Sequence, residues 1–403
     1  FVGGQYSKFT QQINSEISND YNNTAYLLSQ NRQQSYLIDV LTGRADFEKS
    51  FKNEMKWEAG TNISDARSNS RLNIQNYNPQ RQSASDYNYA EKIYSAYTQL
   101  SGKISKIGYS AGLRMENTRV QGGYQDSLTL SVNRNYTKLF PKASVNIPVG
   151  ETKTLTLGYS KSITRPNYSS SSQITTYINP FFEWSHNINI SPSITQEVSA
   201  TVQYKEISWG ASYYRINNPV YYSTEYNDQT NTLRMIDKNY ALESGINLTG
   251  TVPFKYKGWT STNTLVATKD QITDPAAITG KSAPYLYFYS NNQFKLPGGY
   301  DFMVSGWGIT KRNEGIFERN AMAAIDTTIT KTFFKKLTCS LSYNSIISTG
   351  QAKENFNVND VVSRGVYYLN NREVAMSLKY AFGKLKDSKY KNRDVNDDLN
   401  RIK

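Results

Sequence analysis

The chain has 403 residues, a formal net charge of +13 and a mean hydropathy of −0.63. No run approaches the ~18 apolar residues that a transmembrane helix needs, which excludes a membrane protein built from helices. A single cysteine, Cys339, and a single histidine, His186, exclude an intrachain disulfide and leave too few ligands for a His/Cys zinc site. We therefore expect neither a metal nor another cofactor.

Taken in chain order, the clearest predicted elements are strands in which apolar and polar residues alternate. Successive side chains of a strand point to opposite faces. In the segment 107–116, apolar residues occupy the odd positions and glycine, serine or charged residues occupy the even ones. The same pattern recurs at 155–160, 198–204, 246–254, 337–343 and 374–382. In an outer-membrane barrel the apolar face contacts lipid and the polar face lines the lumen.

Two kinds of connection separate these strands. Short turns are predicted at 101–103, 148–151, 205–206, 255–258, 296–299 and 335–336. Long polar loops are predicted at 62–88, 165–193, 224–239 and 349–371. Outer-membrane barrels have short periplasmic turns and long extracellular loops, and counting hairpins gives about sixteen strands. The 32 tyrosines suit the aromatic girdles of such a barrel, although a tyrosine-rich soluble β-protein is an alternative.

The predicted fold is therefore all-β: a transmembrane antiparallel up-and-down barrel over residues 1–382, in the bacterial outer membrane. Its surroundings are outer-membrane lipid and lipopolysaccharide. Residues 383–403 are highly charged, so we expect a disordered periplasmic extension. The final strand ends in Tyr380 and Phe382, which resemble the terminal assembly signal that barrel-insertion machinery recognises.

No catalytic constellation is evident, so we do not expect an enzyme. The acidic pairs Asp39/Asp46 and Glu54/Glu58 lie beside lysine and arginine, and we interpret them as luminal charge pairs rather than acid/base groups. The 46 basic residues are scattered through turns and loops, so no nucleic-acid partner is expected.

One aromatic loop is a candidate for ligand binding. It could stack on a sugar or an aromatic ligand, and it could equally be a packed loop core or an interfacial belt. Its residues are Tyr177, Phe181, Phe182 and Trp184.

Five segments, at 111–118, 139–145, 157–166, 178–181 and 378–384, resemble the C-terminal barrel of Bacteroidota outer-membrane proteins related to TonB-dependent receptors. These proteins form the outer membrane protein beta-barrel family. The family's Gly-Asn-Pro-x-Leu-x-Pro-Glu loop is degraded at 186–193, where Asn187 and Pro192 match outright. This departure concerns the loop and leaves the barrel pattern unaffected.

The resemblance implies a 22-stranded barrel plugged by an N-terminal domain, with this chain as its C-terminal part. The plug, its TonB-coupling box and the first strands are expected to lie outside this sequence, so TonB is an implied partner. The implied function is import of a bulky or scarce solute. The alternatives are a passive porin-like pore, a non-transporting outer-membrane scaffold and a soluble β-rich binding protein.

Overall fold

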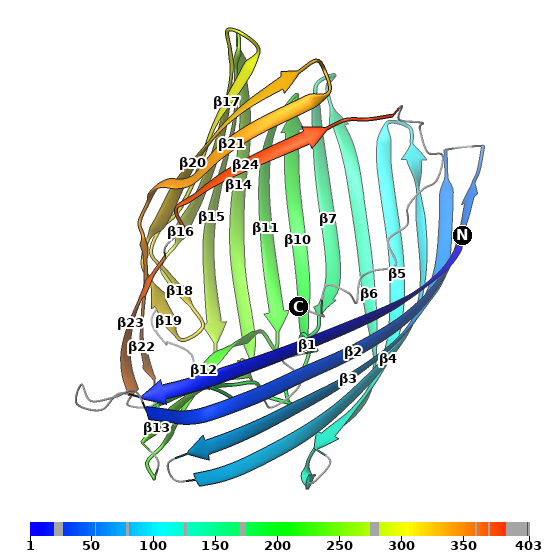
Figure 1. The fold of residues 1–403 in the computed structure, drawn as a ribbon. Coiled ribbons are helices and arrows are strands. Elements are labelled where there is room, and N and C mark those ends of the chain that lie inside the picture. The colour runs from blue at the N-terminus through cyan, green and yellow to red at the C-terminus, as the bar shows by residue number, and fades with distance from the viewer. Residues whose placement is uncertain are drawn as a thin grey trace.

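The computed structural model describes residues 1–19, 27–52, 54–77, 80–124, 127–168, 175–179, 181–229, 231–274, 282–358, 361–369, 371–383 and 401. Sixteen of the strands within these residues form one antiparallel sheet, which confirms the predicted fold class and strand number. Figure 1 shows this sheet curling around an interior. β1 and β24 are its two edges. Within the described ranges, no helix has the length and apolar content needed to cross a membrane.

The strands of the main sheet follow the chain, apart from excursions into smaller sheets. In sheet order they are β1 (Val2–Asn19), β2 (Leu27–Ser50), β3 (Lys56–Tyr77), β4 (Gln80–Ile104), β5 (Ile107–Tyr124), β6 (Ser127–Val149), β7 (Lys153–Thr164), β10 (Ser193–Tyr204), β11 (Ile207–Asn217), β14 (Leu242–Tyr256), β15 (Trp259–Thr273), β16 (Tyr285–Leu296), β17 (Tyr300–Ile309), β20 (Met322–Phe333), β21 (Leu337–Ser348) and β24 (Glu373–Tyr380).

The predicted alternation is confirmed, and its direction follows from burial. On β5, Leu113 and Met115 are 45% and 51% exposed on the outer face, whereas the intervening and following residues Arg114 and Glu116 face the interior. Glu116 is 5% exposed. An apolar outer face and a polar inner face are what a wall between lipid and an aqueous lumen requires.

The short connections gather at one end of the sheet, which we call the turn end. Most lie where predicted, but the turn expected at 101–103 is displaced, because β4 continues to Ile104 and turns at Ser105 and Lys106. Ser105 has a φ of 56°, and Gly150 in the β6–β7 turn has a φ of 69°. Glycine adopts this left-handed region without a steric cost, and Gly150 is placed accordingly.

The long connections gather at the opposite end, which we call the loop end, and they are more ordered than predicted. The expected loop 62–88 is wrong: it is the hairpin of β3 and β4, paired from Lys56↔Ser101 to Tyr77↔Gln80. Its polar residues still alternate inward and outward, but both faces carry polar side chains there. Backbone pairing with the neighbouring strand holds this hairpin where hydrophobic contrast is weak.

Two four-stranded sheets form from the remaining long connections. One comprises β8 (Thr175–Asn179), β9 (Phe182–Ser185), β12 (Val220–Asn227) and β13 (Thr232–Asn239), with β13 and β9 parallel. The other comprises β18 (Arg312–Glu314), β19 (Phe317–Arg319), β22 (Gln351–Val358) and β23 (Val361–Tyr368). A buried cluster joins the two sheets, and we call it the loop core: Met235, Tyr240, Ile316, Phe317 and Phe356.

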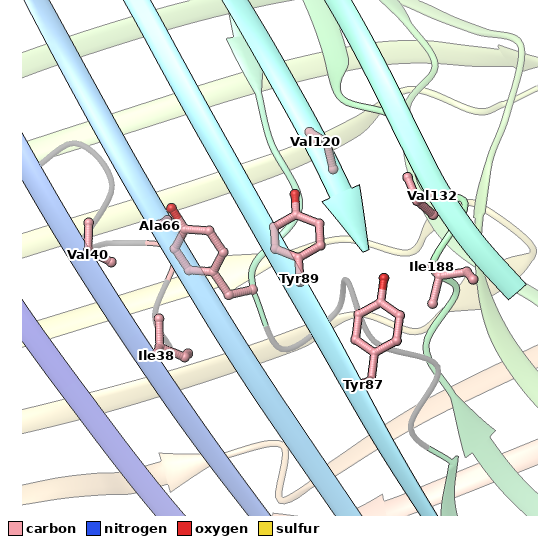
Figure 2. Close-up of a cluster of buried hydrophobic side chains, with 9 residues drawn as sticks. Ile38, Val40, Ala66, Tyr87, Tyr89, Val120, Val132 and Ile188 are labelled. Atoms are coloured by element: carbon pink, nitrogen blue, oxygen red, sulfur yellow. The ribbon is translucent and has the colours of Figure 1, made fainter. Parts of the chain in front are cut away.

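A second buried cluster lies on the inner face of the long strands, towards the loop end (Figure 2). Side chains of the β7–β10 connection pack against side chains of β2 to β6. We call this cluster the wall core: Ile38, Val40, Ala66, Tyr87, Tyr89, Val120, Val132, Tyr168 and Ile188. It fills the interior beside these strands and thereby fixes the connection that follows β7.

Most of the tail predicted for 383–403 lies outside the described residues. Arg401 is described, and it is buried, with 8% of its surface exposed.

Candidate functional site

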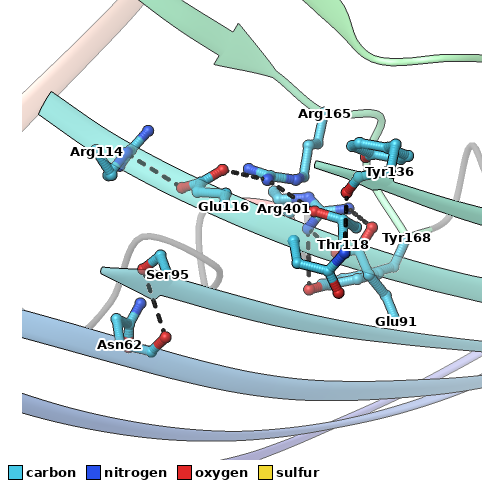
Figure 3. Close-up of polar contacts among 11 residues, drawn as sticks. Asn62, Glu91, Ser95, Arg114, Glu116, Thr118, Tyr136, Arg165, Tyr168 and Arg401 are labelled. Atoms are coloured by element: carbon cyan, nitrogen blue, oxygen red, sulfur yellow. Dashed lines mark hydrogen bonds and ion pairs between the residues drawn. The ribbon is translucent and has the colours of Figure 1, made fainter. Parts of the chain in front are cut away.

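The inner wall of β3 to β7 carries a cluster of charged residues between the turn end and the wall core. Glu116 of β5 is its centre: its Oε1 lies 3.2 Å from Nε of Arg114, and its Oε2 lies 2.6 Å from Nη2 of Arg165. Nη2 of Arg165 also donates to the hydroxyl of Thr118 at 3.3 Å. Figure 3 shows these contacts on the inner face of the wall.

Arg165 directly follows β7 and is held by this cluster. Burial alone lowers the pKa of its guanidinium, but the carboxylates of Glu116 and Glu91, together with Tyr136, outweigh burial, so the pKa is raised. Arg165 therefore remains a fixed positive charge on the wall. Its buried Nε atom has no hydrogen-bond partner among the residues that the structure describes.

A second ion pair lies next to the first. Glu91 on the inner face of β4 is 3% exposed, and its Oε1 lies 2.5 Å from Nη1 of Arg401. Arg401 also contacts Pro166 and Tyr168, which follow β7. Two residues far apart in the sequence, 91 and 401, thus meet on the same wall (Figure 3).

A cavity of about 440 Å³ borders the Glu116–Arg165 pair and Arg401. Its charged lining consists of four arginines and one glutamate: Arg44, Arg114, Arg165, Arg401 and Glu116. Such a cavity lies on the inner face of the wall and combines fixed charges with space, so it can contact a polar solute in the lumen.

Asp46 confirms the interpretation of one acidic residue as a member of a luminal charge pair. It is 2.9 Å from Nε of Arg44 and accepts a hydrogen bond from Tyr97 at 2.7 Å. Gly60 leaves room for this contact, since a Cβ there would lie 2.5 Å from the Tyr97 ring. The prediction that Asp39 faces the lumen is wrong. Its side chain lies on the outer face, where it accepts a hydrogen bond from Tyr6 at 2.5 Å.

The aromatic loop residues are divided between burial and exposure. Phe182 packs against the loop core, and the ring of Trp184 meets that of Tyr222 edge-on at 4.9 Å. Phe181 is 66% exposed. The side chain of Tyr177 lies outside the described part of the chain, although its backbone belongs to β8. Their role in ligand binding stays a prediction.

The single histidine and the single cysteine, His186 and Cys339, lie at positions where they contribute to the fold. Nδ1 of His186 lies 2.8 Å from a carboxylate oxygen of Asp237, and this pair ties the β7–β10 connection to β13. Cys339 is half-buried on β21. Within the described ranges, no three histidine, cysteine, aspartate or glutamate residues are grouped so that they could hold a metal ion.

The predicted assembly residues lie at the end of β24. Tyr380 pairs with Leu337 of β21, and Phe382 follows two residues later with 88% of its surface exposed. Both rings are accessible at the turn end of an edge strand. Whether insertion machinery uses them stays a prediction.

Sequence reasoning missed Glu91, Pro166 and Tyr168 as site residues. Glu91 pairs with Ala66 on one side and with Val120 on the other, and Ala66 in turn pairs with Val40. Glu91 is the one carboxylate of this inward row, which continues to Arg134 on β6, and that carboxylate was the available signal.

Comparison with known proteins identifies a matching family and several similar solved structures. The family model described as "Outer membrane protein beta-barrel family" matches residues 1–380. No curated protein matches the chain. Similar solved structures include the copper transporter OprC, with 11% identity and a TM-score of 0.63, and the ferric yersiniabactin uptake receptor FyuA from Yersinia pestis, with 10% identity and 0.63. The unliganded ferric citrate transporter FecA has 11% identity and a TM-score of 0.59.

These similarities cover nearly all of this chain and only part of the other proteins. They include 94%, 95% and 94% of this chain, and 63%, 59% and 59% of OprC, FyuA and FecA respectively. At such identities the likeness establishes the fold. The chain spans about three-fifths of the length of these structures.

Proposed function

We propose that this chain, which belongs to the outer membrane protein beta-barrel family, forms the barrel wall of an energised importer for a bulky or scarce solute. The family membership and the sixteen-stranded sheet make the chain an outer-membrane β-barrel protein. The proposal adds transport, energy coupling and the nature of the solute.

The observation that supports it is the extent of the structural match. Almost the whole chain superimposes on about three-fifths of a copper transporter, a ferric yersiniabactin uptake receptor and a ferric citrate transporter. A wall that is part of a larger barrel encloses a lumen too wide to seal with its own side chains, and such a lumen needs a plug. We infer that a plug domain connects this wall to TonB.

The polar inner wall fits this role. The Glu116 cluster and the cavity beside it line the route inwards, and the two loop sheets are placed at the loop end, where a solute would enter. A ligand that meets these sheets first and the charged wall next would pass from recognition to translocation.

Electrical recording tests the proposal. The polypeptide is purified from outer membranes with its native termini and inserted into planar bilayers. We expect no stable open-channel conductance, and solute uptake by cells that is lost when TonB is deleted. Stable conductance together with TonB-independent uptake would instead establish a passive pore. Heat-modifiable migration on gels verifies that the barrel is folded in each preparation.

A further inference from the structure

Arg401 is bound to the wall through every nitrogen of its guanidinium. Nη1 donates to Glu91 Oε1 at 2.5 Å, and Nη2 donates to Glu91 Oε2 at 3.3 Å. Nε donates to the carbonyl of Pro166 at 3.1 Å, and Nη1 also contacts the hydroxyl of Tyr168 at 3.3 Å. The guanidinium lies over the Tyr168 ring, with its carbon 4.4 Å from the ring centroid. A two-pronged carboxylate contact and a stacked ring select a planar guanidinium over an ammonium.

The receptor half of this arrangement belongs to the wall and not to the chain end. Glu91 lies on β4, and the backbone at Pro166 and Tyr168 is fixed because Tyr168 packs in the wall core. The Tyr89 hydroxyl donates to Glu91 Oε2 at 3.0 Å and orients the carboxylate. A buried carboxylate without a cation is costly, so this half favours occupation by a guanidinium.

The bound residue comes from the far end of the sequence. Tyr380 ends β24 at the turn end, whereas Pro166 and Tyr168 follow the loop end of β7. Besides the side-chain contacts, the amide of Tyr168 donates to the carbonyl of Arg401 at 3.1 Å. Arg401 also lines the 440 Å³ cavity, so the occupied position borders space in the lumen.

We propose that Glu91, Tyr168 and the Pro166 carbonyl form a guanidinium-binding site, which Arg401 occupies as a tethered ligand until an arginine-bearing peptide replaces it. The site is then a contact point for solutes that present arginine, and the chain's own Arg401 regulates its availability. Its place on a transport path rests on the proposed function, whereas guanidinium binding does not.

Peptide binding to the full-length protein in detergent tests the site. The probes are the tripeptides Gly-Arg-Gly and Gly-Lys-Gly, measured by calorimetry. Arg401→Gln removes the tethered competitor, so Gly-Arg-Gly should bind this variant at least about tenfold more tightly than it binds the wild type. Gly-Lys-Gly should bind it at least about tenfold more weakly than Gly-Arg-Gly does. Adding Glu91→Gln to Arg401→Gln should abolish the gain.

The matched control is Glu58→Gln in the Arg401→Gln background. Glu58 is paired with Lys56 at 2.8 Å on the same inner wall, away from Arg401, so the gain should persist. Equal Gly-Arg-Gly affinity in wild type and Arg401→Gln, or equal affinity for both peptides, would overturn the proposal. Arg401→Gln leaves Glu91, Pro166 and Tyr168 in place, so this comparison decides even if Glu91→Gln does not assemble. Binding is measured without transport, so failure here is separate from failure of the importer proposal.

Discussion

In strands β2 to β5, the half near the turn end has an apolar outer face, whereas the half near the loop end has a polar one. Near the turn end the outer face is apolar, with Phe47 on β2 and Leu113 on β5 exposed. Towards the loop end the outer face becomes charged, and Asp65, Lys92 and Arg119 stand side by side in one register row. The inner face changes in the opposite sense, from the charged Glu116 cluster to the apolar wall core.

This inversion of polarity between the two faces indicates where the bilayer ends. A membrane-spanning β-strand needs about 9–11 residues, whereas β2, β3 and β4 have 24, 22 and 25. The excess continues into water as the same strands, with polar residues outside and a packed core inside. β7, β10 and β11, with 12, 12 and 11 residues, have only the membrane half, and their connections fold into separate sheets.

The largest expected effect comes from a charge on the outer face of the membrane half. Leu113→Arg should destabilise the inserted barrel by about 2–4 kcal/mol, because the guanidinium would face the bilayer core. Gln121→Arg lies on the same face of β5, eight residues further on, and should cost under about 1 kcal/mol. Folding into lipid vesicles under a urea titration measures both. Equal costs would show that the polarity switch does not mark the bilayer boundary.

The end of β24 provides a second test, because this strand consists of the membrane half alone. Phe382→Asp should lower the level of folded protein in the outer membrane, since a carboxylate replaces the ring at the lipid boundary, at a cost of about 1–3 kcal/mol. Removing residues 383–403 should leave insertion unchanged. Heat-modifiable migration of membrane fractions compares the two, and equal levels would refute the assembly role of Phe382.

Inside the loop half, packing replaces lipid contact. Ile38→Val removes one methylene from the wall core and should cost about 0.5–1.5 kcal/mol. Ile63→Val, on the outer face of β3 in the membrane half, leaves no such cavity because lipid fills the space, so its cost should be smaller. The same urea titration distinguishes them. If both variants lose equal stability, the interior of the loop half is not a packed core.

The same inversion explains which features could be predicted from the sequence. At 107–116 one face meets lipid and the other meets the lumen, so alternation is strong and the strand was predicted. At 62–88 the outer face is polar beyond Ile63, and inward positions such as Ser64, Ala66 and Ser70 carry small side chains. The contrast between faces is then weak, and a paired hairpin was interpreted as a loop.

The residues of the candidate site also differ in how far the sequence predicts them. Arg114 and Glu116 stand on the polar face of a predicted strand, and Arg165 lies in a segment that carries the family resemblance. The contact between Glu91 and Arg401 joins positions 310 residues apart. Only the curvature of the finished sheet and the packing of Tyr168 bring these two residues together, and no local pattern encodes that meeting.

The smallest stability effect is expected in the aromatic loop, where separate sheets replace the continued strands. Phe181 is exposed, so Phe181→Ala should change the unfolding free energy by less than about 0.5 kcal/mol. Trp184→Ala loses the edge-on contact with Tyr222 and should cost about 0.5–1.5 kcal/mol. If Phe181 stacks on a sugar or aromatic ligand, its alanine variant should lose ligand affinity without losing stability, which fluorescence titration against a panel of such ligands measures. An unchanged affinity for every ligand that binds the wild type would remove Phe181 from the binding surface and leave this loop with a packing role.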